Sequence, residues 1–264
     1  MSDRAGGKTT TQLLLHQYKY DQKEFWREPA GVFFTVVMPL IFLFLFVSIF
    51  GNDALPVRGH EIKASTYYVP GIVTLALVSA TSLNLAITFT ILREKGQLKR
   101  VRSTPLPPWI YLGGRVLTAT VVCFLLTAAL VLLGWVVYDV SVPTNTLPGL
   151  LVTLVLGTVV GCALGFAFTA IIPSANSAPA VTNAIVLPLY FFSGIFVPDD
   201  TLPDSMKTIG SLFPVRHLFQ AFLFAFDPAT KGTGIAVGHL AVVAAWGIAA
   251  GLVGVRYFRW TPRG

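Results

Sequence analysis

Charged residues are scarce in this sequence. Asp, Glu, Lys and Arg make up only 12% of the 264 residues, whereas a soluble domain usually carries about 25%. Hydrophobic residues account for 54%, and the mean hydropathy is +0.71. So little polar material cannot cover the surface of a water-soluble globule of this size. The composition therefore indicates a protein whose main solvent is lipid.

The chain is also poor in groups that carry redox, metal or nucleotide chemistry. Its two cysteines, Cys123 and Cys162, lie in apolar runs, which predicts buried side chains rather than a disulfide or a metal site. A phosphate-binding loop has the form G-x-x-x-x-G-K-[ST] between a strand and a helix. Residues 7–9 resemble its end, but Ser2 stands where the first glycine belongs and no strand is expected before it. We expect this chain to bind no cofactor and to hydrolyse no ATP.

What the sequence does have is long apolar runs. A helix needs about 20 apolar residues to cross a bilayer. Five stretches lack charged residues, and the longest, 140–198, is long enough for two spans because turn-forming residues interrupt it at 173–176. The sequence predicts an all-α membrane protein, a single transmembrane domain over residues 1–264. Six spans are expected, near residues 31–50, 67–92, 112–138, 148–172, 177–197 and 234–255.

The net charge of +7 indicates orientation rather than nucleic-acid binding, because Lys and Arg flank the apolar runs. Most of the 19 basic residues precede the first span, lie between spans two and three, or follow the last. The side with more basic residues is normally cytoplasmic. Both termini are therefore expected in the cytoplasm.

Two segments outside the spans are amphipathic. In residues 10–29, apolar side chains recur at helical spacing among charges, which predicts a helix on the cytoplasmic membrane surface; a helix packed on the protein itself is the alternative. In residues 198–231, an apolar part too short to cross follows an acidic front. It is interpreted as an external helical pair, divided at Pro214 and re-entering the outer leaflet. The alternative is a loop lying flat on the headgroups.

The predicted spans lack the residues that an ion-coupled carrier or an intramembrane enzyme would use. Ion-coupled carriers usually place ionisable groups in the membrane, and the inner part of these spans has no Asp, Glu, Lys or Arg. His239, near the start of the last span, is expected to be structural. An intramembrane enzyme would need a nucleophile, base or metal cluster that the sequence does not offer. An ion-coupled secondary transporter and, less favoured, a membrane enzyme stay as alternatives.

A transporter that cannot drive transport by itself needs a partner that supplies the energy. The cytoplasmic loop at residues 93–105 offers a surface for contact with such a partner. Leu98 and Val101 share one face of a short helix among basic residues. Ser103 or Thr104, followed by Pro105, is typical of the N-cap of the next helix. A basic loop that serves only as a topology signal is the alternative.

Two motifs then resemble a known family. REKGQLKRVRSTPLPPW (93–109) and LPLYFFSGIFVPDDTLPDSMKTIGSLFPVRHL (187–218) look like segments of the type-2 permeases of ATP-binding-cassette exporters, closest to the drug- and antibiotic-resistance branch. The resemblance covers nearly the whole chain. It implies a bacterial cytoplasmic membrane protein that moves drugs, antibiotics, lipids or glycolipids outward.

The resemblance also implies partners and site residues. A separate ATPase subunit would hold ATP and Mg, and a second permease subunit, identical or homologous, would complete the path within membrane lipid. Residues 10–29 would form the connecting helix, and residues 198–231 would close the exit. The ATPase would be contacted through Glu94, Gly96, Leu98, Lys99 and Arg100. The external gate would include Pro198, Pro214 and His217. Aromatic clustering suggests a path lined by Phe42, Phe46, Tyr190, Phe191 and Phe192, for which contact with lipid is the alternative.

Overall fold

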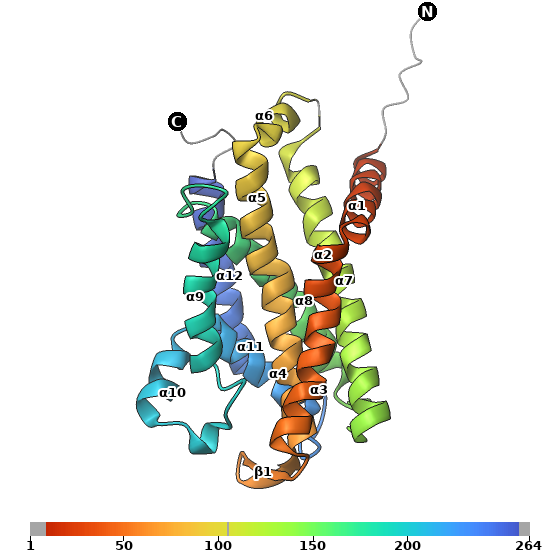
Figure 1. Cartoon of the computed structure of the whole chain (residues 1–264), viewed down its shortest axis with the longest axis vertical. Coiled ribbons are helices and arrows are strands. Elements are labelled where there is room, and N and C mark those ends of the chain that lie inside the picture. The colour runs from red at the N-terminus through yellow and green to blue at the C-terminus, as the bar shows by residue number, and fades with distance from the viewer. Residues whose placement is uncertain (1–8, 105, 259–264) are drawn as a thin grey trace, which may run out of the picture.

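The computed structural model describes residues 9–104 and 106–258. It is an elongated bundle whose long helices run side by side along the longest axis (Figure 1). At one end lie α1 (Thr10–Arg27) and α6 (Gln97–Arg102), and at the other lie β1 (Ala54–Val57) and α10 (Asp204–Ser211). The two ends correspond to the predicted cytoplasmic and external sides.

In the described part of the chain, five helical runs are long and apolar enough to cross a membrane. Helices are the expected solution, because lipid offers no hydrogen bonds to the backbone. The chain is an all-α membrane protein, as predicted. Short π-helical turns, η1 (Phe33–Val37) and η2 (Ser79–Leu83), interrupt the first two runs. The runs are α2 (Pro29–Val32) to α3 (Met38–Phe50), α4 (Ala64–Val78) to α5 (Asn84–Glu94), α7 (Pro108–Tyr138), α8 (Leu147–Phe168) and α12 (Val237–Tyr257).

The fifth predicted span, residues 177–197, is a shorter helix than expected. α9 (Ala178–Phe192) has 15 residues, which at 1.5 Å per residue is about 22 Å, less than the roughly 30 Å of a bilayer core. The helix ends because Gly194 adopts a left-handed conformation, with φ 86°. The chain then returns into the protein, where Ile195 is buried.

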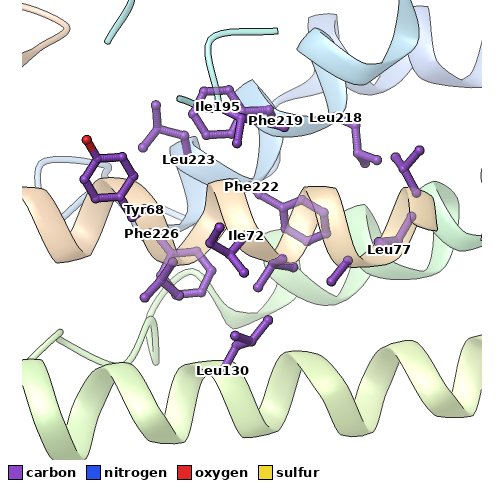
Figure 2. Close-up of a cluster of buried hydrophobic side chains, with 14 of the residues drawn as sticks. Tyr68, Ile72, Leu77, Leu130, Ile195, Leu218, Phe219, Phe222, Leu223 and Phe226 are labelled. Atoms are coloured by element: carbon purple, nitrogen blue, oxygen red, sulfur yellow. The ribbon is translucent and has the colours of Figure 1, made fainter. Parts of the chain in front are cut away.

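The segment after α9 forms a bent helical pair. A short 3-10 turn, η3 (Asp199–Thr201), precedes α10, and α10 meets α11 (Pro214–Phe226) at an angle of 100°. α11 lies inside the bundle: Figure 2 shows Phe219, Phe222 and Phe226 gathered with Ile72 of α4 and Leu130 of α7. The protein itself therefore encloses α11, while its depth in the bilayer stays a prediction.

A two-stranded hairpin at the external end was not predicted. β1 pairs with β2 (His60–Lys63) in antiparallel register, and the turn between them places Arg58 and Gly59 at positive φ. Arg58 Nη2 donates to the side-chain oxygen of Gln220 on α11 at 3.0 Å. His60 Nε2 lies 2.9 Å from the Asp227 carboxylate, just after α11. The hairpin therefore clasps α11 at its outer end.

Close packing of α8 on η2 depends on Gly161. A Cβ added there would overlap the Thr81 hydroxyl and lie 2.9 Å from Thr81 Cβ. Ser82 Oγ donates to the Gly161 carbonyl at 2.9 Å. Small residues at such contacts let membrane helices approach closely.

Gly161→Ala is expected to destabilise the protein by about 1–3 kcal/mol, because overpacking forces α8 away from η2. Gly251→Ala is the matched control, since an added Cβ on that α12 glycine meets nothing within 4 Å. Thermal unfolding of the purified variants in detergent measures both. Equal unfolding temperatures for the two variants would contradict the proposed role of this contact.

Candidate functional site

The basic helix α6 sits at the predicted cytoplasmic end, beyond α5 (Figure 1). It begins at Gly96, whose φ of 67° turns the chain sharply after α5. An added Cβ at Gly96 would meet no neighbour, so glycine is required there by backbone conformation rather than by space. The predicted contact residue Gly96 is thus the turn that sets the direction of α6.

The predicted N-cap of the third span at Ser103 or Thr104 is wrong. α7 begins at Pro108, with Pro107 as its N-cap residue. Both hydroxyls instead donate to carbonyls of α6 and close its C-terminus. Ser and Thr can satisfy either end of a helix, so their presence alone did not decide between the two. Pro105 lies outside the described residues.

The two faces of α6 differ sharply. Leu98 is fully buried in a cluster with Phe89 and Tyr111, and Val101 packs against the same cluster. Leu98 therefore anchors α6 on the bundle and does not present itself to a partner. The outward face is basic and exposed, and includes Lys99, Arg100 and Arg102, with the exposed Lys95 just before the helix.

Arg93 and Glu94, at the end of α5, hold the turn between α8 and α9. Arg93 is buried and donates to the carbonyls of Thr169 at 2.9 Å and Ile172 at 2.8 Å. Glu94 accepts the Ala175 amide at 2.8 Å. The uncharged turn at residues 173–176 is thereby brought beside α6. Arg93 was not predicted from the sequence as a functional residue. The signal that could have found it is the C-terminal end of α8, which has no cationic residue of its own to bond to its last carbonyls.

α1 packs on α7 through one face and leaves another exposed. It opens with a capping box between Thr9 and Gln12. Leu14 lies against Gly113 of α7. The exposed apolar side chains of the other face are Leu15, Tyr20 and Trp26. One face of α1 therefore contacts the protein, while exposed apolar side chains on another could contact lipid. The location of α1 on the membrane surface stays a prediction.

An ion-pair network joins α1 to α7. Arg115 lies 3.3 Å from Asp21 and donates to Glu24 at 2.7 Å. Gln17 Nε2 donates to Asp21 Oδ1 at 2.9 Å. Burial raises the pKa of Asp21 to about 6, since desolvation outweighs the opposing effects of Arg115 and Gln17. Asp21 is thus mainly ionised at neutral pH, although burial of its charge is unfavourable.

Two of the three predicted gate residues lie on α11. Pro214 is buried at its first turn, where the missing amide hydrogen does no harm. His217 contacts the Ser211 carbonyl through Nε2 at 2.8 Å and His239 of α12 through Nδ1 at 2.9 Å. His239 therefore helps to hold the bend in place. Pro198 is half-buried and immediately precedes η3.

Two of the predicted path aromatics meet around a residue that was not predicted. Phe46 stacks on Phe196 with ring centroids 5.7 Å apart, and Phe191 lies 5.2 Å from the same ring. Phe46 also contacts Tyr68. Phe191 is 61% exposed. This aromatic cluster lies between α3, α4 and the chain after α9. Its central residue, Phe196, belongs to the FFSGIF run of the sequence, residues 191–196.

The other predicted path residues take different roles. Tyr190 is buried, and its hydroxyl contacts Ser79 Oγ at 3.0 Å and donates to the Leu75 carbonyl at 3.1 Å. It ties α9 to the second helical run and does not face an open path. Phe42 packs against the main core, and Phe192 is half-buried.

Within residues 9–104 and 106–258, no group of three or more His, Cys, Asp or Glu side chains could hold a metal ion. Cys123 and Cys162 are both buried free thiols. The described part of the chain thus combines a basic helix, α6, at one end, the hairpin and α11 at the other, and a helical run from α5 to α4 between them.

Comparisons with known proteins identify a family and several relatives of this chain. The model of the family described as ABC-2 type transporter matches residues 13–226, from α1 to the end of α11. The chain is 23% identical to a putative transport permease, YvfS, of Bacillus subtilis, over 78% of this chain and 82% of the relative. It is 24% identical to the inner membrane transport permease YadH of Escherichia coli, over 81% and 85%. It is 30% identical to the daunorubicin resistance ABC transporter permease protein DrrB1 of Streptomyces coeruleorubidus, over 73% and 67%.

Proposed function

Because the chain belongs to the ABC-2 type transporter family and is a transmembrane transport subunit of an ABC transporter, we propose that it exports a hydrophobic or amphipathic substrate. Export would run outward across the bacterial cytoplasmic membrane, with both termini inside. The power would come from a separate ATPase subunit that holds ATP and Mg. Catalysis of ATP hydrolysis would belong to that subunit alone.

The observation that carries this proposal is the build of α6. Its apolar face is fixed to the bundle by Leu98, so a force applied to the basic face reaches the protein rather than a loose loop. Lys99 and Arg100 stay exposed for a partner. Arg93 and Glu94 lock the neighbouring turn to the same point. A basic loop that only sets topology would need none of these contacts.

The path for movement follows the second helical run. α5, η2 and α4 run continuously from α6 to the hairpin (Figure 1). α11 packs on α4, and Tyr190 ties α9 to the same run. Closure of the ATPase on ATP would shift α6 and rock this stiff run, so that the hairpin and α11 move at the exit. The mechanism is rigid-body motion.

A second permease subunit, identical or homologous, would complete the path. The exposed apolar residues of α3 and α9, such as Phe44, Ile49 and Phe191, support this, because they leave apolar surface on the outside of the bundle that a second subunit could cover. An amphipathic substrate would move along such apolar and aromatic walls. The drug-resistance function in the name of one relative, DrrB1, is in keeping with such a substrate.

Reconstitution tests the proposal against its rivals. The chain is purified in mild detergent with the ATPase that accompanies it, and both are placed in vesicles loaded with a fluorescent amphipathic dye. Export is expected only when the ATPase and ATP with Mg are present. Dye movement by the chain alone under a proton or sodium gradient would show an ion-coupled carrier. Conversion of a substrate without any vesicle would show a membrane enzyme.

A further inference from the structure

The hairpin contacts the outer end of α11 at two points that differ in chemistry. Arg58 Nη2 donates to the side-chain oxygen of Gln220 at 3.0 Å and to its carbonyl at 3.2 Å. About two helical turns further along, His60 Nε2 lies 2.9 Å from Asp227 Oδ1. Arginine in a protein is always charged, whereas histidine gains or loses its charge between about pH 5 and 8. The first contact is therefore permanent, and the second depends on pH.

Asp227 is a carboxylate in a position that disfavours negative charge. It is the C-cap residue of α11, and the C-terminal end of a helix carries partial negative charge. Its side chain is only 4% exposed, so water does little to stabilise the charge. Oδ1 accepts the Ala229 amide at 2.9 Å, but this donor is neutral. A buried acid at the end of a helix calls for a cationic partner.

His60 is the residue that can supply the positive charge. Within residues 9–104 and 106–258, it is the one side chain that forms an ion pair with Asp227. The side chain of His60 is 33% exposed, so protons from the surrounding water can reach it. Protonated His60 makes a charge-assisted hydrogen bond, roughly twice as strong as a neutral one. Neutral His60 leaves the buried carboxylate without a counter-charge, which is unfavourable.

Other charged groups near the hairpin do not replace His60. Side chains alternate along β2, so Glu61 and Lys63 are exposed on the face opposite to His60. Arg58 is directed to α11, where its guanidinium lies 5.2 Å from the centre of the Phe224 ring. Further acidic and basic residues in the neighbouring segments, none of which forms an ion pair with His60 or Asp227 within the described part of the chain, are Asp53, Asp200, Arg216, His217, Lys231 and His239.

We propose that His60 and Asp227 form a proton-controlled latch between the hairpin and α11. Acid on the hairpin side charges His60 and fastens the hairpin to the end of α11. At higher pH this bond weakens, the contact of Arg58 remains, and the hairpin moves away from α11 more often. The latch itself is independent of the proposed function. Its consequence for transport rests on that function, because a fastened hairpin at the exit would slow export.

Distances between two spin labels test the latch in the full chain, in nanodiscs and with no ATPase present. The labels are attached at Pro56→Cys on β1 and Thr233→Cys before α12, both exposed positions. The native cysteines are buried and are not expected to react. One short distance is expected at pH 5.5. At pH 8 the ratio of a longer to the short distance should rise about fivefold, the effect of losing the charge from one hydrogen bond. Identical distance distributions at the two pH values would overturn the proposal.

Three variants sharpen the test. His60→Gln keeps a donor but gains no charge, so the longer distance should be equally frequent at both pH values. His60→Lys is charged at both and should keep the short distance at pH 8, so the test remains decisive if His60→Gln fails to fold. Asp227→Asn should also lose the pH response. His16→Gln, an exposed histidine of α1 at the opposite end, is the control. A wild-type pH response in His60→Gln and Asp227→Asn would refute the latch.

The contact between His217 and His239 is a second titratable group at the same end, 2.9 Å between the two Nδ1 atoms. It holds α11 to α12 and does not involve the hairpin. His217→Gln should therefore leave the pH response of the hairpin unchanged. Loss of the response in His217→Gln, together with its retention in His60→Gln, would assign the pH response to the histidine pair and refute the latch.

Failure of this inference is distinct from failure of the proposed function. The label distances require no ATPase, so a pH-dependent hairpin without ATP-driven export would refute only the exporter. Export by a chain whose hairpin ignores pH would refute only the latch. In vesicles that contain the ATPase, export should be slower when the hairpin side alone is brought from pH 8 to pH 5.5. His60→Gln should abolish that difference, and an equal difference in His60→Gln would contradict the latch.

Discussion

Reversal of the two exposed charges on α6, by Lys99→Glu together with Arg100→Glu, is expected to abolish ATP-driven transport in a protein that still folds. Both side chains are exposed, and surface substitutions of this kind usually change stability by no more than about 0.5 kcal/mol. Like charges placed across an interface cost several kcal/mol, so binding of the ATPase should weaken by about 100-fold or more. Co-purification of the ATPase and dye export from vesicles measure the two losses.

The charge-conserving pair Lys99→Arg with Arg100→Lys is the matched control and should keep most of the transport. Lys231→Glu, an exposed residue before α12 at the opposite end, controls for a general loss of positive charge. If the reversed variant binds the ATPase and transports like the wild type, α6 is not the contact surface. Loss of transport by Lys231→Glu to the same degree would also contradict it.

Arg93→Ala is expected to lower the stability of the protein by about 2–5 kcal/mol, because each buried carbonyl left without its donor costs about 1–3 kcal/mol. Arg93 is 1% exposed and satisfies two carbonyls beyond the end of α8. Without it, those carbonyls lose their donors and a cavity the size of the side chain remains. The thermal unfolding temperature in detergent, together with the yield of inserted protein, measures the effect.

Arg93→Lys separates charge from geometry. Lysine keeps the charge but lacks the rigid fork that reaches two carbonyls at once, so a loss between wild type and Arg93→Ala is expected. Arg100→Ala is the exposed control and should unfold near the wild-type temperature. An unchanged unfolding temperature for Arg93→Ala would mean that the turn at residues 173–176 is held by other contacts.

These two predictions probe opposite sides of one mechanical element. Lys99 and Arg100 lie on the side that a partner can reach, whereas Arg93 and Leu98 lie on the side that the bundle holds. A coupling element needs both, because a platform that slips on the bundle transmits no movement. Reversed charges should therefore uncouple a stable protein, and loss of Arg93 should remove the stability itself.

Local patterns predicted the spans well where one helix supplied the whole signal. In lipid, residues 108–138 can satisfy their backbone hydrogen bonds only by forming a helix. The span predicted at residues 112–138 was therefore found as α7, which begins at Pro108. The same reasoning overestimated the span at residues 177–197, because Gly194 ends α9 and no local signal distinguished that glycine from one that a helix tolerates. The hairpin at residues 54–63 was missed because its strands are too short to show a clear alternation.

The sequence by itself determined that this chain is a membrane protein, that its long apolar runs are helices, and that a basic helix lies between the second and third spans. Each of these depends on composition and on periods of a few residues. Only the tertiary structure decided that Leu98 faces inward, that Arg93 donates to the Thr169 carbonyl 76 positions away in sequence, and that Asp21 meets Arg115. Such pairings depend on how stiff helices pack against one another, and packing brings together residues whose spacing along the chain carries no trace of the contact.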